Sequence, residues 1–194
     1  MDQSNTNYKL ITLPNIDLRK KSTKVGIVND EIKNIIESMK IVLLKWEDER
    51  KHEVGVALAA IQIDVPMKII IVRNNLDDKN NHNFDVFINP IITKYEGELV
   101  KDYEGCLSIK DLYGNVPRYN KVRIKATDIN GIPIRHTVKG FLARVFQHEI
   151  DHNNGKLFID HIKDDPDAFY KLMPDGKLEK MDYENDIKKN NILW

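Results

Sequence analysis

Two histidines and a glutamate stand together in residues 148 to 152, which read His-Glu-Ile-Asp-His. In an α-helix, residues four positions apart lie on one face, so both imidazoles can bind the same metal ion and Glu149 faces the same space as a candidate proton acceptor. Phe141, Val145, His148 and His152 follow one another at spacings of four, three and four residues, which is a single core-facing stripe. The spacing predicts a metal site on the inner face of a buried helix.

Two histidines do not complete a metal site, and the sequence offers three kinds of third ligand. In one zinc-protease pattern a histidine follows at the position that Phe158 occupies here. In another pattern a helical glutamate serves, but Glu179 and Glu184 lie in a polar, lysine-rich segment with little apolar surface to hold them. The remaining candidate is Cys106, the only cysteine in the chain, which follows Gly105. A lone cysteine is most often a small buried hydrophobic residue, although a preceding glycine lets the backbone turn tightly beside a ligand.

Three motifs stand in order along the chain. Residues 55 to 62 read Gly-Val-Ala-Leu-Ala-Ala-Ile-Gln. Residues 104 to 108 read Glu-Gly-Cys-Leu-Ser, and residues 147 to 152 read Gln-His-Glu-Ile-Asp-His. Together they resemble the peptide deformylase family, whose first motif is Gly-x-Gly-Leu-Ala-Ala-x-Gln and whose other two motifs are intact here. The resemblance covers roughly residues 8 to 165. Three ordered motifs are far more specific than one, so the chain is similar to this family in more than its metal motif.

The chain departs from the family pattern in three places. Ala57 stands where a second glycine is usual, Asn153 stands where a leucine is usual, and residues 46 to 53 form a longer and more charged stretch than is typical. Alanine still offers its backbone N–H, so a hydrogen bond to a substrate at this position survives unless the site requires a positive φ. The departures concern the approach of the substrate backbone rather than the metal.

The resemblance implies one divalent metal ion held by Cys106, His148 and His152. It favours Fe(II), with Zn, Ni or Co as alternatives in purified protein. Three protein ligands leave an open position on a tetrahedral ion, which is typical of catalytic rather than structural sites. Glu149 is then the expected general base, since it adjoins a ligand on the same helix face.

The resemblance also implies donors for the oxyanion that forms when a carbonyl is attacked. These are the side-chain amide of Gln62 and the backbone N–H of Leu107. Arg118 is a candidate partner for Glu104 in support of the cysteine loop, and Asp151 is expected to point away from the metal. Pairs of this kind orient metal ligands.

The implied reaction is hydrolysis of the N-formyl group from the initiator methionine of nascent polypeptides, with release of formate. The implied partner is therefore the nascent chain at the ribosome. The walls of an apolar methionine pocket would include Val56, Phe141 and Val145. An extended peptide would lie beside Gly55 and Ala57 as an added strand.

Two other functions share parts of this pattern. A zinc endopeptidase carries the same His-Glu-x-x-His motif, but its third ligand is missing at position 158. A metal-stabilised module that binds blocked N-termini would hold an ion without turnover, and the presence of Glu149 and Gln62 argues against it.

The composition excludes several other classes of protein. Lys+Arg and Asp+Glu both number 30, so the formal net charge is zero, and neither nucleic acid nor an anionic membrane is an expected partner. The first residues are polar without an apolar segment typical of a signal peptide, and no apolar run is long enough to span a bilayer. A single cysteine agrees with a reducing compartment. We therefore expect a cytoplasmic protein, with residues 1–194 forming a single catalytic domain.

The order of the expected elements indicates the fold class. Helical spacing begins at Asn29 or Asp30 and continues to Trp46, and β-branched runs predict strands at 69–72 and 86–88. Strand-like segments at 122–127 and 132–138 flank Asn130-Gly131, a two-residue hairpin signal. The metal-site helix follows between glycines 140 and 155, and the charged tail, residues 166–194, is compatible with a last helix. This pattern predicts an α+β fold with mostly antiparallel strands around a central helix that carries the His-Glu-x-Asp-His motif.

Overall fold

The computed structural model describes residues 6–50, 52–76, 78 and 81–192. Its two main helices are α1 (Asp30–Asp48) and α2 (Gly140–Asn153). The strands are β1 (Ala57–Ala59), β2 (Ile69–Arg73), β3 (Phe84–Cys106), β4 (Ile109–Thr127), β5 (Pro133–Lys139), β6 (Phe169–Leu172) and β7 (Leu178–Lys180). They pair antiparallel in the order β1-β2-β3-β4-β6-β7, with β5 also on β4. The predicted α+β fold is confirmed.

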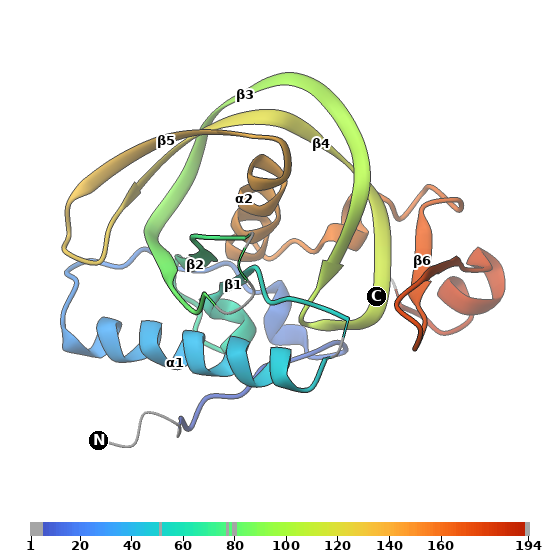
Figure 1. Ribbon diagram of the computed structural model, residues 1–194, viewed down its shortest axis with the longest axis horizontal. Coiled ribbons are helices and arrows are strands. Elements are labelled where there is room, and N and C mark those ends of the chain that lie inside the picture. Colours follow the sequence, from blue (N-terminus) through green and yellow to red (C-terminus); the bar gives the residue numbers. More distant parts are fainter. Residues whose placement is uncertain (1–5, 51, 77, 79–80, 193–194) are drawn as a thin grey trace.

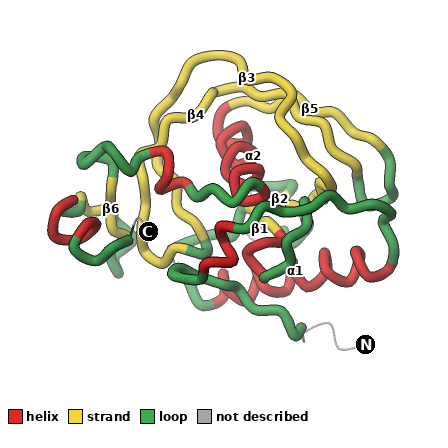
Figure 2. Tube along the Cα trace, turned by 180° about the vertical axis from the view of Figure 1, so that it is seen from behind, coloured by secondary structure: helices red, strands yellow, loops and turns green. Residues whose placement is uncertain are grey.

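Helix α2 occupies the centre of the molecule. The long strands β3 and β4 arch over it, and α1 lies on the opposite side of β1 and β2 (Figure 1). Short turns of helix join these elements at Ile16–Arg19, Ala60–Ile63 and Phe158–His161. Seen from behind, β6 lies beside the arch, and α2 again stands beneath β3, β4 and β5 (Figure 2). The motif helix is thus enclosed by strands, as its apolar stripe predicted.

Strand β2 is buried along its whole length because both of its faces are covered. Ile69 and Ile71 pack in a cluster with the apolar face of α1. Ile70 and Val72, which point the other way, pack in a second cluster with Phe146 of α2. A continuous apolar run is therefore the expected sequence of this strand, and β2 holds the two helices at a fixed separation.

The ends of both helices agree with the sequence. The Asn29 side chain accepts a hydrogen bond from the N–H of Ile32 and caps α1. Helix α2 ends just before Gly155, which has φ +70°. A Cβ atom at Gly155 would lie 2.2 Å from the Arg19 carbonyl oxygen, so this glycine permits the close approach of the N-terminal segment.

The predicted hairpin is present, but its turn is not the expected two-residue type. Strands β4 and β5 pair up to Thr127 and Pro133, so five residues form the loop. The Asp128 carboxylate accepts the N–H of Asn130 at 2.9 Å, and only Gly131 of the Asn-Gly pair has a positive φ, 82°. A two-residue type I′ turn needs a positive φ at both positions. The Asp128 side chain accepts backbone N–H groups within the five-residue loop and so stabilises it in place of a two-residue turn.

The C-terminal segment contains more strand than helix. Strands β6 and β7 form a hairpin that extends the sheet from β4, and the helical part is the short segment Tyr183–Lys188. Ile187 is fully buried in a cluster with Phe158 and Phe169. No helix in the described ranges is long and apolar enough to cross a membrane.

Candidate active site

The three expected metal ligands come together beneath the arch. Cys106 is the last residue of β3, and His148 and His152 lie one turn apart on α2. One donor atom from each lies within 4.8 Å of the others, and Cys106 Sγ is 3.3 Å from His152 Nε2. All three side chains are at least nine-tenths buried. The two motifs that are 42 residues apart in sequence, from Cys106 to His148, therefore meet at one point.

Glu104 organises the charged groups around these ligands. Its carboxylate is buried and accepts hydrogen bonds from His148 Nδ1 at 3.0 Å, Arg118 Nε at 2.9 Å and Arg144 Nη1 at 2.7 Å. Because Nδ1 is bonded to Glu104, Nε2 is the ring nitrogen of His148 that faces Cys106 and can bind a metal ion. The expected pairing of Arg118 with Glu104 is confirmed. The role of Arg144 was not predicted. The one sequence signal for it is that a charged residue interrupts the apolar stretch before His148, which indicates a buried partner.

Burial and charge partners shift the pKa values of these groups. Burial raises the pKa of Glu104, but the bonds from His148 and Arg118 outweigh it and hold the pKa well below its usual range. Burial lowers the pKa of His148, but its bonds to Cys106 and Glu104 raise it well above its usual value. Burial, and then the charge of His148, lower the pKa of His152. The buried carboxylate of Glu104 is therefore ionised and keeps His148 oriented.

Asp151 lies on the other side of Arg118 from Glu104. Its Oδ2 atom accepts hydrogen bonds from Arg118 Nη1 at 2.6 Å and from His161 Nε2 at 2.7 Å. The expectation that Asp151 points away from the ligands is confirmed. Arg118 thus bridges the carboxylates of Glu104 and Asp151 and ties β4 to the outer face of α2.

Glu149 is buried beside the ligands and faces the cavity. Its Oε2 atom has no hydrogen-bond partner within the described residues. Burial raises the pKa of Glu149 to about 7, while the charge of His148 acts in the opposite direction. Buried polar atoms are normally hydrogen-bonded, so this oxygen is expected to accept a hydrogen bond from a ligand or a water molecule.

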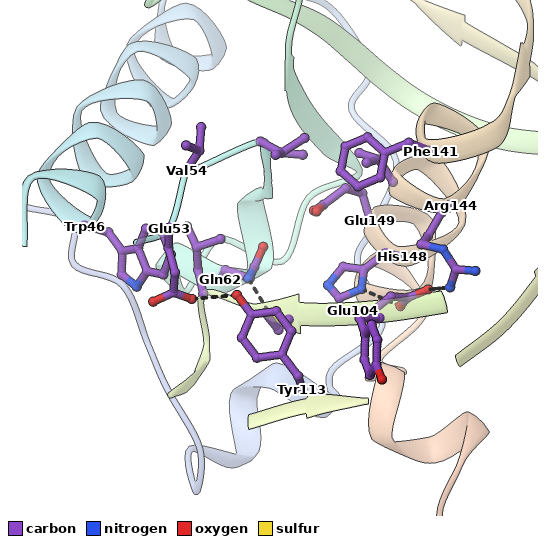
Figure 3. Close-up of a pocket in the computed structure, with 17 residues that line it drawn as sticks. Trp46, Glu53, Val54, Gln62, Glu104, Tyr113, Phe141, Arg144, His148 and Glu149 are labelled. Atoms are coloured by element: carbon purple, nitrogen blue, oxygen red, sulfur yellow. Dashed lines mark hydrogen bonds and ion pairs between the residues drawn. The ribbon is translucent and has the colours of Figure 1, made fainter. Parts of the chain in front are cut away.

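A cavity of about 230 Å³ opens next to these groups (Figure 3). Seven of the expected site residues outside the metal triad line it, namely Val56, Ala57, Gln62, Leu107, Phe141, Val145 and Glu149. Gly55 is not among the lining residues. Residues that the sequence reasoning missed complete the wall, among them Trp46, Glu53, Val54, Tyr103, Tyr113 and Arg144.

Gln62 is held with its amide nitrogen toward the cysteine. Its Oε1 atom accepts the N–H of Ala59 at 2.9 Å, while Nε2 donates to Ser108 Oγ at 3.1 Å and lies 3.6 Å from Cys106 Sγ. Leu107 lies in the two-residue turn between β3 and β4. Both residues expected to donate to the oxyanion therefore line the cavity beside Cys106.

The donor set fits a single transition-metal ion. A thiolate and two imidazoles suit Zn, Fe, Ni and Co, whereas Mg and Ca prefer oxygen. Metal–ligand bonds of about 2.1 to 2.3 Å at tetrahedral angles place ligand atoms about 3.5 Å apart. The 3.3 Å separation of Cys106 Sγ and His152 Nε2 matches that geometry. All three ligand atoms lie within 4.8 Å of one another, so the His148 side chain needs to move only slightly to bind the same ion. Fold and site together define a metal-dependent hydrolase.

Comparison with known proteins agrees with this class. Residues 7–167 match the model of the polypeptide deformylase family. A peptide deformylase of Buchnera aphidicola subsp. Acyrthosiphon pisum is 36% identical over 177 residues, covering 91% of this chain and 94% of the relative. One of Aquifex aeolicus is 37% identical, covering 79% and 86%. The crystal structure of a Synechococcus elongatus peptide deformylase in complex with actinonin superposes with a TM-score of 0.73 at 34% identity, covering 81% of this chain and 82% of that chain.

The chain belongs to the peptide deformylase family, and it carries a metal cofactor. The endopeptidase alternative is not favoured. At the position of that pattern's third ligand, the Phe158 ring is stacked on His148 with the ring centroids 6.1 Å apart. Phe158 therefore covers one side of the histidine and offers no donor.

Proposed function

We propose that Cys106, His148 and His152 hold the metal ion with which this member of the peptide deformylase family removes the formyl group from the N-terminal methionine of new polypeptides. Fe(II) is the proposed native ion, with Zn, Ni or Co as replacements in purified protein. When bound, such an ion brings the pKa of a coordinated water to about 7 and polarises a carbonyl group. Glu104 supports the site by holding His148 in one orientation.

Glu149 is the general base in this proposal. The observation that carries it is the buried Oε2 of Glu149, which has no hydrogen-bond partner among the described residues and lies in the cavity wall with Cys106 and His148. From there Glu149 can accept a proton from the attacking water and return it to the amine that leaves. The oxygen of the formyl group would receive hydrogen bonds from Gln62 Nε2 and from the Leu107 N–H, both at the same end of the cavity.

The methionine side chain would occupy the apolar part of the cavity, between Val56, Phe141 and Val145. Among the described residues, β1 is the terminal strand of the sheet and pairs only with β2, so the peptide would continue along its other edge. Val56 directs its carbonyl group to β2, where it accepts the N–H of Arg73 at 2.8 Å. Neighbouring residues of a strand direct their backbone groups to opposite edges, so Ala57 is the residue placed to bind the peptide backbone. The proposed setting is the cytoplasm, on nascent chains at the ribosome.

Formate release from formyl-Met-Ala-Ser tests this function. The protein purified without oxygen should release formate, lose activity to a chelator, and regain it when about one equivalent of Fe(II) is added. Cys106→Ala should lose both metal and activity, because two imidazoles remain without the charge-neutralising thiolate. Full metal occupancy in this variant would show that Cys106 is only a buried core residue.

A further inference from the structure

An ion pair behind the cavity wall holds the segment that leads into β1. Arg73 is the last residue of β2, and its side chain is fully buried. Its Nη2 atom pairs with Glu47 on the last turn of α1, and its Nε atom donates to the Gly55 carbonyl at 3.0 Å. Glu47 Oε2 in turn accepts the N–H of Gly55 at 3.3 Å. Both backbone polar groups of Gly55 are therefore bound to the two members of one ion pair.

Further contacts hold Arg73 from other directions. Nη1 donates to the Asn81 carbonyl at 2.6 Å, and the guanidinium carbon lies 5.2 Å from the ring centre of Phe84. Arg73 is fully buried and Glu47 is 18% exposed, so the guanidinium loses its hydration when the pair forms and the net gain in stability is small. A role in holding local geometry accounts for this arrangement better than stability does.

Helix α1 also confines Gly55 through Leu43, one turn before Glu47. A Cβ atom at Gly55 would lie 2.5 Å from Leu43 Cδ2, and Leu43 is fully buried in α1. The backbone of Gly55 is thus held by Glu47 and Arg73, and its Cα lies against the helix. The next two residues, Val56 and Ala57, line the catalytic cavity. Neither Arg73 nor Glu47 is among the residues that line it.

We propose that the Arg73–Glu47 pair is a positioning device for β1 that sets the affinity for the substrate backbone beyond its first residue. The pair fixes Gly55, and through it the backbone of β1, whose edge at Ala57 would receive the peptide. The proposal rests on the proposed function in one respect: the peptide must bind along β1. It predicts that loss of the pair weakens the binding of peptides of several residues and leaves the binding of a single formylated residue unchanged.

Two substrates separate this role from a general structural one. Formyl-Met-Ala-Ser can pair with β1, whereas formyl-methionine amide has almost no backbone beyond the first residue. In the wild type, the tripeptide should have the lower KM. Arg73→Met should raise the KM of the tripeptide by about tenfold, which corresponds to the loss of roughly one hydrogen bond to the peptide backbone. The kcat for both substrates, the KM of formyl-methionine amide and the metal content should stay within about twofold.

Two further variants complete the experiment. Glu47→Gln keeps the volume but removes the charge, so it should shift the tripeptide KM in the same direction and by less. Arg19→Met is the matched control, because it removes a guanidinium that pairs with Asp160 away from the cavity wall. It should lower the thermal stability and leave the ratio of the two KM values unchanged.

The outcomes are distinguishable. If Arg73→Met and Glu47→Gln keep the wild-type ratio of KM values, or change both substrates equally, the pair is only structural and the inference is wrong. Equal KM values for the two substrates in the wild type would contradict peptide binding along β1 instead. That result would overturn this part of the proposed function, and the inference with it.

Discussion

The two ends of the catalytic cavity are built in different ways. At the inner end, the carboxylate of Glu104 is buried and bonded to His148, Arg118 and Arg144 at once. At the outer end, Trp46, Glu53 and Tyr113 lie on the side of the cavity away from Arg144 and His148 (Figure 3). The inner groups come from β3, β4 and α2, whereas Trp46 and Glu53 come from the last turns of α1 and the segment after it.

The contacts at the outer end are closer to solvent. The Tyr113 hydroxyl donates to Glu53 Oε1 at 3.0 Å, and Arg50 Nη1 lies 3.3 Å from Glu53 Oε2 and 2.6 Å from Asp111 Oδ1. The side chains of Arg50 and Asp111 are 20% and 35% exposed, so water screens their charges. Chemistry at the inner end should therefore depend strongly on single groups, and binding at the outer end only weakly.

The largest effect is expected from Glu149→Gln. The amide keeps the shape of the side chain but cannot accept a proton, so kcat should fall by about 10²- to 10⁴-fold. Metal content should be unchanged because Glu149 is not a ligand. Formate release and bound metal, measured on the same sample, check this separation. Near-normal formate release would remove Glu149 from the mechanism.

Glu104→Gln should have the next largest effect. It weakens the group that orients His148, so metal affinity should fall by about 10- to 100-fold in competition with a chelator. Arg144→Met is the control, because it breaks a buried pair with Glu104 without touching the bond to His148. This control should lower the free energy of unfolding by about 3 to 5 kcal/mol and change metal affinity much less. Equal losses of metal affinity in both variants would contradict an orienting role for Glu104.

Tyr113→Phe should have the smallest effect. Burial and the nearby Glu53 carboxylate raise the pKa of Tyr113, so its hydroxyl stays protonated and donates to Glu53. Loss of this one bond at the outer end should change KM by about threefold at most, with kcat and metal content unchanged. Steady-state kinetics on formyl-Met-Ala-Ser provide the measurement. A loss of kcat as large as that of Glu149→Gln would show that the two ends act as one unit.

The sequence predicted the inner end better than the outer end, for a physical reason. A metal site needs particular side chains, so Cys106, His148 and Glu149 could be recognised by type and spacing. The outer wall needs only shape and a few polar contacts, so nothing in the types of Trp46, Glu53 or Tyr113 indicated that they line a cavity. The unusual charge of residues 46 to 53 is the one available signal, and it marks a departure from the family pattern without indicating a cavity.

Strands β3 and β4 show the same limit for the fold. Only residues 86–88 and 122–127 of these strands were predicted, where apolar residues face the core. The β3 half of the intervening arch is largely exposed, and its register on β4 shifts at several bulges, so its apolar residues follow no regular alternation. Its stability comes from pairing between distant segments, such as Ile92 with Ile124, which sequence patterns do not reveal.

The most direct test of the account compares formyl-Met-Ala-Ser with acetyl-Met-Ala-Ser on the metal-loaded protein. With Gln62 and Leu107 both beside Cys106, the oxygen of a small formyl group can reach both donors, whereas an acetyl methyl group adds bulk at the same point. We expect the formyl peptide to release formate at least about 100-fold faster than the acetyl peptide releases acetate, with no internal peptide bond cleaved in either. Equal rates on the two peptides, or cleavage between Met and Ala, would contradict deformylation at this site.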